Sequence, residues 1–171
     1  MICIVDQNNK IINIVNADSP TRENERIGYP WCSLWEQYTD VEPLEYVKQR
    51  KLSEFSRWTA ANITGGFVSS ASGEPVRYDS DKETQLTMQG IALNVSTPLF
   101  AAKYPNGCPV RGVAEGAESK SVYWLKPEQV MQWMADLSMH IGTCKQAGWA
   151  KQAEVEACKT TEEVASVTLE L

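Results

Sequence analysis

The stretch from Phe67 to Gln85, FVSSASGEPVRYDSDKETQ, decides the fold. Two short runs, Phe67–Ser70 and Pro75–Tyr78, flank the polar turn ASGE, and this pattern predicts a β-hairpin. Residues 80–83 (SDKE) then match the S-x-x-E capping box, in which a serine and a glutamate satisfy each other's free backbone N–H groups. The stretch therefore predicts a hairpin followed at once by a helix start, which indicates an α+β fold.

A helix is predicted immediately upstream, over residues 43–63. Pro43 suits a first helical position, because its missing N–H would have no partner there. Apolar side chains recur at three- and four-residue spacing, but Lys48 and Lys51 interrupt the stripe. Such an interrupted seam is compatible with self-association without defining a coiled coil. Gly65-Gly66 then ends the helix.

Further helices are predicted downstream. The first covers residues 81–95, with Leu86, Gly90 and Leu93 on one stripe and a second apolar stripe beside it. Residues 98–120 are rich in Gly, Pro, Ala and Ser and predict a long loop, and residues 122–125 (VYWL) predict a strand. The clearest helix spans 127–158, and residues 160–163 (TTEE) offer a second capping box before a short last helix.

The N-terminal region predicts a second hairpin. Ile2–Val5 and Ile11–Val15 are β-branched apolar runs separated by DQNNK, whose Asn and Asp residues suit a tight turn. The polar stretch over residues 16–28 predicts a loop. The segment YPWCSLWEQY follows, with four aromatic residues at Tyr29, Trp31, Trp35 and Tyr38.

So many aromatic side chains need a surface to cover, which is either the hairpin or a partner subunit. Both alternatives remain open from the sequence. The aromatic residues of the predicted linking helix belong to the same set, because that helix is a candidate for self-association. The candidate partner-contact residues are therefore Tyr29, Trp31, Trp35, Tyr38, Phe55 and Trp58.

Together these elements predict an α+β architecture with three parts. Residues 1–42 form a small N-terminal β-hairpin module with its aromatic segment. Residues 43–64 form a linking helix, and residues 65–171 form a mainly α-helical domain with a short β-hairpin.

Composition and charge narrow the function classes. The net charge of −6 repels a phosphate backbone, and no basic run interleaved with aromatics occurs, so nucleic-acid binding is not expected. No run approaches the ~18 apolar residues of a membrane span, and the first residues lack the features of a signal peptide. We expect a soluble protein made in a cytoplasm, with no membrane partner and with reduced, mostly buried cysteines.

The sequence shows no residues typical of catalysis or of cofactor or metal binding. Its one histidine, His140, lies near an apolar stripe of a predicted helix, where a boundary residue is more common than a ligand or base. Asp79 and Asp81 resemble the start of a calcium loop, but Thr84 and Gly90 stand where that loop requires glycine and glutamate. We therefore predict no catalytic residue, no cofactor and no metal, and we expect that the chain is not an enzyme.

The order of these elements resembles a family of phage and prophage tail proteins that carry a domain of unknown function, DUF4376. The pattern has a charged helix (VKQRKLSEFSRWTAAN), a glycine-led strand pair (GGFVSSASGEPVRYDSD) and a helix that opens on Thr84-Gln85. An aromatic strand (VYWL) and a helix that begins LKPEQV then follow, with one histidine near the middle of that helix. The resemblance covers about residues 45–168, and the N-terminal hairpin is similar to short modules that precede this domain.

The resemblance implies a location, the phage tail, and no established activity. We expect a non-enzymatic structural or adaptor component of the tail, associated with the tail fibre or baseplate. It would be made in the host cytoplasm and built into the virion. Its expected partners are other tail proteins and further copies of itself, in a homo-oligomer such as a trimer. The alternative is a tail-fibre assembly chaperone that is not retained in the virion.

Overall fold

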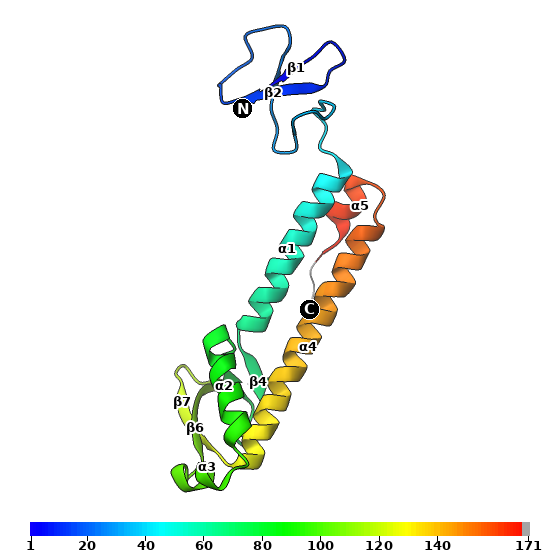
Figure 1. Cartoon of the computed structure of the whole chain (residues 1–171). Helices are drawn as coiled ribbons and strands as arrows, with labels where there is room; N and C mark the ends of the chain where they lie inside the picture. The colour runs from blue at the N-terminus through cyan, green and yellow to red at the C-terminus, as the bar shows by residue number, and fades with distance from the viewer. Residues whose placement is uncertain (169–171) are drawn as a thin grey trace. The chain divides into compact units, whose positions relative to one another are not determined.

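A computed structural model describes residues 1–168 of the chain (Figure 1). The chain forms two compact units. The first unit contains Met1–Leu52 together with Val155–Thr168, and the second contains Ser53–Glu154. Both units combine helix and strand, so the predicted α+β class is confirmed.

The first unit contains a three-stranded antiparallel sheet in the order β2-β1-β3. Strands β1 (Ile2–Val5) and β2 (Ile11–Val15) form the predicted hairpin. Strand β3 (Glu25–Ile27) falls inside the predicted loop, so that part of the prediction was wrong. The three residues of β3 show no apolar alternation, because they lie at a sheet edge and are ordered by backbone pairing to β1.

Helical segments complete the first unit. It holds the start of α1 (Leu44–Thr64), the end of α4 (Pro127–Ala157) and the short helix α5 (Thr161–Ser166). The Thr160 side chain accepts a hydrogen bond from the N–H of Glu163, which confirms the predicted serine/threonine cap. The Glu163 carboxylate accepts from the N–H of Lys159 rather than from that of Thr160. The reciprocal half of the predicted capping box is therefore displaced by one residue.

The second unit is built on a four-stranded antiparallel sheet, β4-β5-β6-β7. Its first two strands, β4 (Phe67–Ser69) and β5 (Val76–Tyr78), form the predicted hairpin. Strand β6 (Cys108–Ala114) pairs with β5, and β7 (Ser121–Leu125) pairs with β6. The strand predicted at 122–125 is therefore confirmed as β7.

Helix α2 (Lys82–Asn94) follows this hairpin as predicted, but the predicted loop over residues 98–120 was wrong. Helix α3 (Pro98–Lys103) begins there, because Thr97 caps it and Pro98 occupies its first turn. Strand β6 could not be recognised from the sequence, because a glycine, Gly112, occupies a buried position where a strand normally has a large apolar residue. A side chain at Gly112 would place its Cβ 2.4 Å from Val76, so the buried face cannot carry a larger residue there.

The core of the second unit lies between the sheet and its helices. The buried side chains come from all four strands and from α2, α3 and α4: Phe67, Ala71, Val76, Tyr78, Met88, Val95, Phe100, Cys108, Val110, Leu125, Val130, Trp133 and Leu137. Within this unit α1 and α4 run side by side in opposite directions (Figure 1). A Cβ at Gly148 of α4 would lie 2.2 Å from the Thr59 hydroxyl of α1, so the two helices approach closely at this glycine.

Candidate functional site

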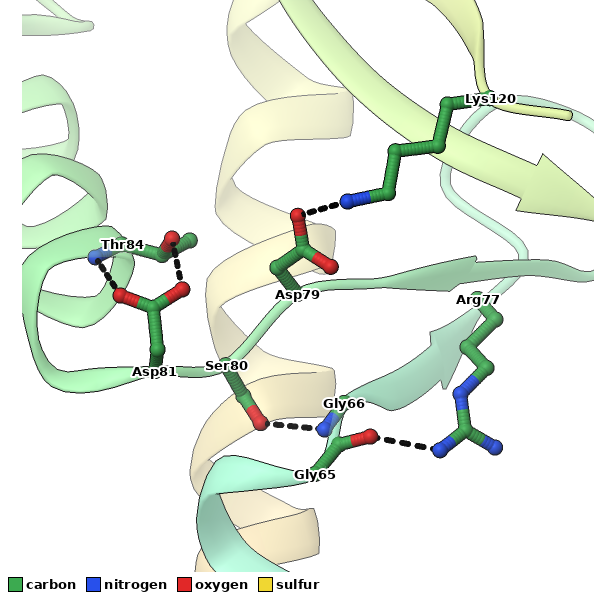
Figure 2. Close-up of polar contacts among 8 residues, drawn as sticks. All are labelled: Gly65, Gly66, Arg77, Asp79, Ser80, Asp81, Thr84 and Lys120. Carbon is green, nitrogen blue, oxygen red and sulfur yellow. Dashed lines mark hydrogen bonds and ion pairs between the residues drawn. The ribbon is translucent and has the colours of Figure 1, made fainter.

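The hairpin, the end of α1 and the start of α2 meet at a buried hydroxyl (Figure 2). The Ser80 Oγ donates a hydrogen bond to the carbonyl of Ile63 at 2.6 Å and accepts one from the N–H of Gly66 at 2.8 Å. The carbonyl of Ser80 in turn accepts from the Gln85 side chain at 2.6 Å. Ser80 is fully buried. One side chain therefore satisfies backbone groups at the end of α1 that would otherwise lack partners.

The N-cap of α2 is Asp81, so the prediction of Ser80 as the capping residue was wrong. The hydroxyl of Ser80 is already occupied by the end of α1. The Asp81 carboxylate instead accepts from the N–H of Thr84 at 3.0 Å and from its hydroxyl. These hydrogen bonds, first that of the Thr84 side chain and then that of its backbone, lower the pKa of Asp81. Sequence alone offers two adjacent capping residues and does not decide between them.

The acidic residues of this junction face different partners. Asp79 forms an ion pair with Lys120, while Asp81 turns to Thr84 (Figure 2). Among the described residues, no group of three or more His, Cys, Asp or Glu side chains is arranged to hold a metal ion. The resemblance to a calcium loop therefore has no counterpart in the geometry of these acids.

Backbone conformation explains the glycine pair before the hairpin. Gly66 has a φ of +101°, and a Cβ there would lie 2.9 Å from the carbonyl oxygen of Tyr78. The Arg77 guanidinium donates to the carbonyl of Gly65, which gives the end of α1 a second side-chain partner (Figure 2). The junction is a capping structure, and its residues are used in holding α1, the hairpin and α2 together.

A groove with a volume of about 610 Å³ lies between β4 and one side of α4. The Ser69 hydroxyl donates to Asp136 Oδ2 and the Gln132 amide donates to Oδ1, each at 2.6 Å. Because Ser69 of β4 is buried, its hydrogen bond holds the Asp136 carboxylate in a fixed orientation. Phe67, Val68 and Met139 add an apolar lining. The groove combines an apolar surface with an oriented negative charge.

His140 also lines this groove, in the half-buried position predicted for it. Its Nε2 lies 3.0 Å from the carbonyl oxygen of Asn62, which can only accept, so Nε2 carries the proton. Cys144, one helical turn later, places its Sγ 3.8 Å from Nε2. The i, i+4 spacing on a helix could have indicated this pair. Burial raises the pKa of Cys144, which keeps the thiol protonated and disfavours a thiolate nucleophile.

Comparison with known families now identifies the chain's class. Residues 46–168 match a family described as a domain of unknown function, DUF4376. The chain belongs to the DUF4376 family. The predicted DUF4376 domain, expected over about residues 45–168, is thereby confirmed, while the association with phage tails stays a prediction. No curated protein and no solved structure matches the chain.

The DUF4376 match begins in α1, and the aromatic segment lies before it. The Tyr29 and Trp31 rings stack with centroids 4.8 Å apart, and Trp31 Nε1 donates to the carbonyl of Thr39. Tyr38 packs against the small core of the first unit and donates its hydroxyl to the carbonyl of Ile27 at 3.0 Å. Of these three half-buried residues, only Tyr38 packs against the hairpin, whereas the Tyr29 and Trp31 rings contact each other.

Trp35 differs from its aromatic neighbours. Its side chain is 64% exposed, and its backbone has a φ of +70°, a left-handed conformation that is uncommon for a residue with a Cβ. Its N–H donates to the carbonyl of Ile11 at 2.7 Å, and the N–H of Ile11 donates to the carbonyl of Glu36. Backbone bonds to β2 therefore hold this strained residue with its indole outward.

The two remaining candidate contact residues belong to the second unit. Phe55 is fully buried, and Trp58 is half-buried, so neither presents a largely exposed ring. The six aromatic candidates are thus divided between the two units, four in the first and two in the second. Their role as partner contacts stays a prediction.

Helix α2 of the DUF4376 domain carries an apolar stripe that sequence reasoning did not single out as a surface. Leu86 is 70% exposed and Leu93 is 82% exposed, with Gly90 between them. Met88, on the opposite side, is fully buried. Both stripes were visible in the sequence, but their periodicity alone does not tell which faces the core.

No helix among the described residues is both long and apolar enough to cross a membrane.

Proposed function

We propose that the chain is a non-enzymatic structural or adaptor component of a bacteriophage tail, associated with the tail fibre or baseplate. It would act through protein–protein contacts with other tail proteins and with copies of itself. The observation that carries this proposal is the outward leucine stripe of α2. The tail location is supported only by the resemblance of the order of elements to tail proteins with this domain.

The leucine stripe has the properties expected of a contact surface. Large apolar residues that are exposed on the same helix face lose unfavourable contact with water when a partner covers them. Helix α2 is also fixed before any partner arrives, because Asp81 caps its first turn and Met88 anchors its inner face. A fixed helix loses little conformational freedom on binding.

Exposed Trp35 would provide a second contact in the first unit. Tryptophan is enriched at the centres of protein interfaces, where its large ring is removed from water. Its left-handed backbone is held by bonds to β2, so the ring is offered in a defined direction. Contacts in both units are what an adaptor between two tail components requires.

The proposal is tested with purified virions of a phage that encodes the chain. Mass spectrometry should find the wild-type protein in particles at a fixed ratio to the major tail protein. The variant Leu86→Gln/Leu93→Gln should fold normally but be depleted from particles, because glutamine retains helix propensity and removes the apolar surface. Thr87→Ala, an exposed substitution on the same helix that lies outside the leucine stripe, is the matched control and should be incorporated normally.

Two outcomes would overturn the proposal. Absence of the wild-type protein from virions, with fibre protein soluble only when the chain is co-expressed, would assign it to the alternative role of assembly chaperone. Lysis of peptidoglycan by the purified chain would instead make it an enzyme.

A further inference from the structure

The two edges of the four-stranded sheet differ in their protection. Strand β7 forms one edge and is flanked in sequence by Lys120 and Lys126, and exposed lysines discourage pairing with another strand. Strand β4 forms the other edge. It contains no proline or lysine, and its register with β5 is regular, without a bulge. Strand β4 is short, with three residues, but it has no lysine, proline or bulge, so the β4 edge is the one without charged or kinked protection against a further strand.

The groove described above runs beside this unprotected edge. Its lining includes residues 66–70 on one side and, on the other side, five residues of α4: Gln132, Asp136, Met139, His140 and Thr143. Phe67 and Ser69 are buried beneath the strand, while Val68 is 61% exposed. A segment lying next to β4 would meet the few backbone groups that this three-residue edge strand turns away from β5, and on the helix side it would meet Met139, which is 69% exposed.

Charge selects the kind of segment that fits. Asp136 is half-buried, and none of the residues that line the groove is a lysine or arginine. Ser69 and Gln132 each use one accepting position on the carboxylate, which has about four such positions in all. The remaining positions can accept from a cation. A basic side chain would be favoured here, and an acidic one would be repelled.

We propose that the groove between β4 and α4 binds an extended segment of a partner protein, which adds a strand to the β4 edge and places a lysine or arginine beside Asp136. The inference rests on the proposed function, since it supplies the site of one protein–protein contact. Backbone hydrogen bonds would provide part of the affinity, and the Asp136 contact would provide selectivity.

The test uses the full-length chain labelled with ¹⁵N and an acetylated, amidated probe peptide of sequence TVKVT. Binding should shift the amide resonances of Gly66 to Ser70 and of the facing turns of α4. The matched peptide TVEVT should bind about five- to tenfold more weakly, as expected for loss of one partly exposed ion pair and gain of repulsion. A TVKVT peptide methylated on alternate backbone nitrogens should lose binding, because it cannot donate to the strand edge.

Variants of the chain provide the reciprocal evidence. Asp136→Asn should abolish the preference for TVKVT over TVEVT while leaving the remaining resonances in place. Glu118→Gln removes one exposed negative charge outside the groove and should leave the preference unchanged. Equal binding of the two peptides to the wild-type chain, or no shift at β4 at millimolar peptide, would overturn the inference. These two overturning outcomes are measured on the wild-type chain, so they do not depend on how well a variant folds.

The outcomes also separate this inference from the proposed function. If the wild-type chain does not bind the peptide but is present in virions, the proposed binding role of the groove is wrong and the proposed tail role stands. If the chain binds TVKVT selectively but is absent from virions, the proposed binding role of the groove stands and the proposed tail role is wrong.

Discussion

The two sheets of the protein are stabilised in different ways. Sheet β2-β1-β3 has four buried apolar residues among those described, namely Ile2, Cys3, Val5 and Ile11, and a loop is fixed to it by backbone hydrogen bonds. Sheet β4-β5-β6-β7 lies against a core of thirteen buried side chains from strands and helices. In the first sheet, stability comes largely from backbone hydrogen bonds, which constrain direction but leave many side chains facing outward. In the second sheet, stability comes largely from the close packing of interior side chains, which depends on their volume and shape.

This difference determines which substitutions each region tolerates. Changes of interior volume should be costly in the second unit, because closely packed side chains leave no room to relax. Changes of exposed side chains in the first unit should cost little as long as the backbone hydrogen bonds remain. The following substitutions test that contrast, from the largest expected effect to the smallest.

Phe67→Ala should destabilise the second unit by about 3–5 kcal/mol, because it removes a ring that contacts Tyr78 and Trp133 and leaves a cavity. Urea unfolding followed by circular dichroism measures the loss. Val68→Ala, on the exposed side of the same strand, should change stability by less than about 0.5 kcal/mol. Equal losses for the two variants would contradict a stability based on interior packing.

Ser80→Ala should cost about 2–3 kcal/mol, because it leaves the carbonyl of Ile63 and the N–H of Gly66 without their shared partner. Hydrogen exchange at Gly66 should rise together with the fall in the urea midpoint. Ser70→Ala, an exposed serine next to the same hairpin strand, is the control. A fully stable Ser80→Ala chain would show that the buried hydroxyl is not needed to close α1.

Two glycines of α4 should respond in opposite directions to alanine. Gly148→Ala should destabilise the chain by about 1–3 kcal/mol, since its Cβ would collide with Thr59. Gly142→Ala should stabilise it by about 1 kcal/mol, because nothing lies within 4 Å and alanine is the better helix former. Thermal unfolding of the pair measures both effects, and a shared sign would refute the close helix contact.

Each unit has a carboxylate that caps backbone N–H groups, half-buried Glu25 in the first and exposed Asp81 in the second, and both should respond to acid. The backbone hydrogen bond from Thr21 is the largest cause lowering the pKa of Glu25, and the Thr84 side chain is the largest lowering that of Asp81. A lowered folded-state pKa means that the stabilisation is present above the unfolded-state pKa and is lost as pH falls through the folded-state value. Glu25→Gln and Asp81→Asn should therefore each flatten the loss of stability below about pH 4. The measurement is the urea midpoint of each variant and of the wild type between pH 7 and pH 3. If the caps contribute nothing, the midpoints of the variants will fall with pH in parallel with those of the wild type.

Trp35→Asn should have the smallest effect, a change of less than about 0.5 kcal/mol in unfolding free energy. The indole is mostly exposed, and asparagine adopts a left-handed backbone more readily than other residues with a Cβ. Amide exchange in β1 measures the local stability. If Trp35 forms a tail contact, the same variant should be depleted from virions despite its normal fold. A large loss of stability would mean that the ring supports the first unit instead.

Much of the architecture could be predicted because its periodicity is local. The long stripe of α4 and the alternating runs of the two hairpins are set by neighbouring residues, and these elements were confirmed. Strand β3 and strand β6 could not be found in this way. The pairing of β3 depends on β1, and Gly112 of β6 is small because Val76 and Tyr78 occupy the space beside it. Those causes lie in distant parts of the chain.

The candidate surfaces show the same limit. Phe55 was selected from the sequence as a contact residue because of its aromatic ring, but the fold buries that ring completely. Leu86 and Leu93 are exposed, and the sequence did not indicate them as a contact surface. Residue type indicates that a side chain prefers an apolar environment, but only packing tells whether the chain itself supplies that environment. The oriented carboxylate of Asp136 was equally hidden, because its hydrogen-bond partner Ser69 lies on a different element.

The position of Ser80 also fixes a spacing. Its hydroxyl bridges residues 63 and 66, so the chain between the end of α1 and the start of α2 can change in length only where it leaves that bridge undisturbed. The turn at Gly73, where a side chain would meet nothing within 4 Å, is such a place. Related chains could therefore lengthen this turn and acquire new surface loops, while the residues beside Gly66 and Ser80 stay constant in number.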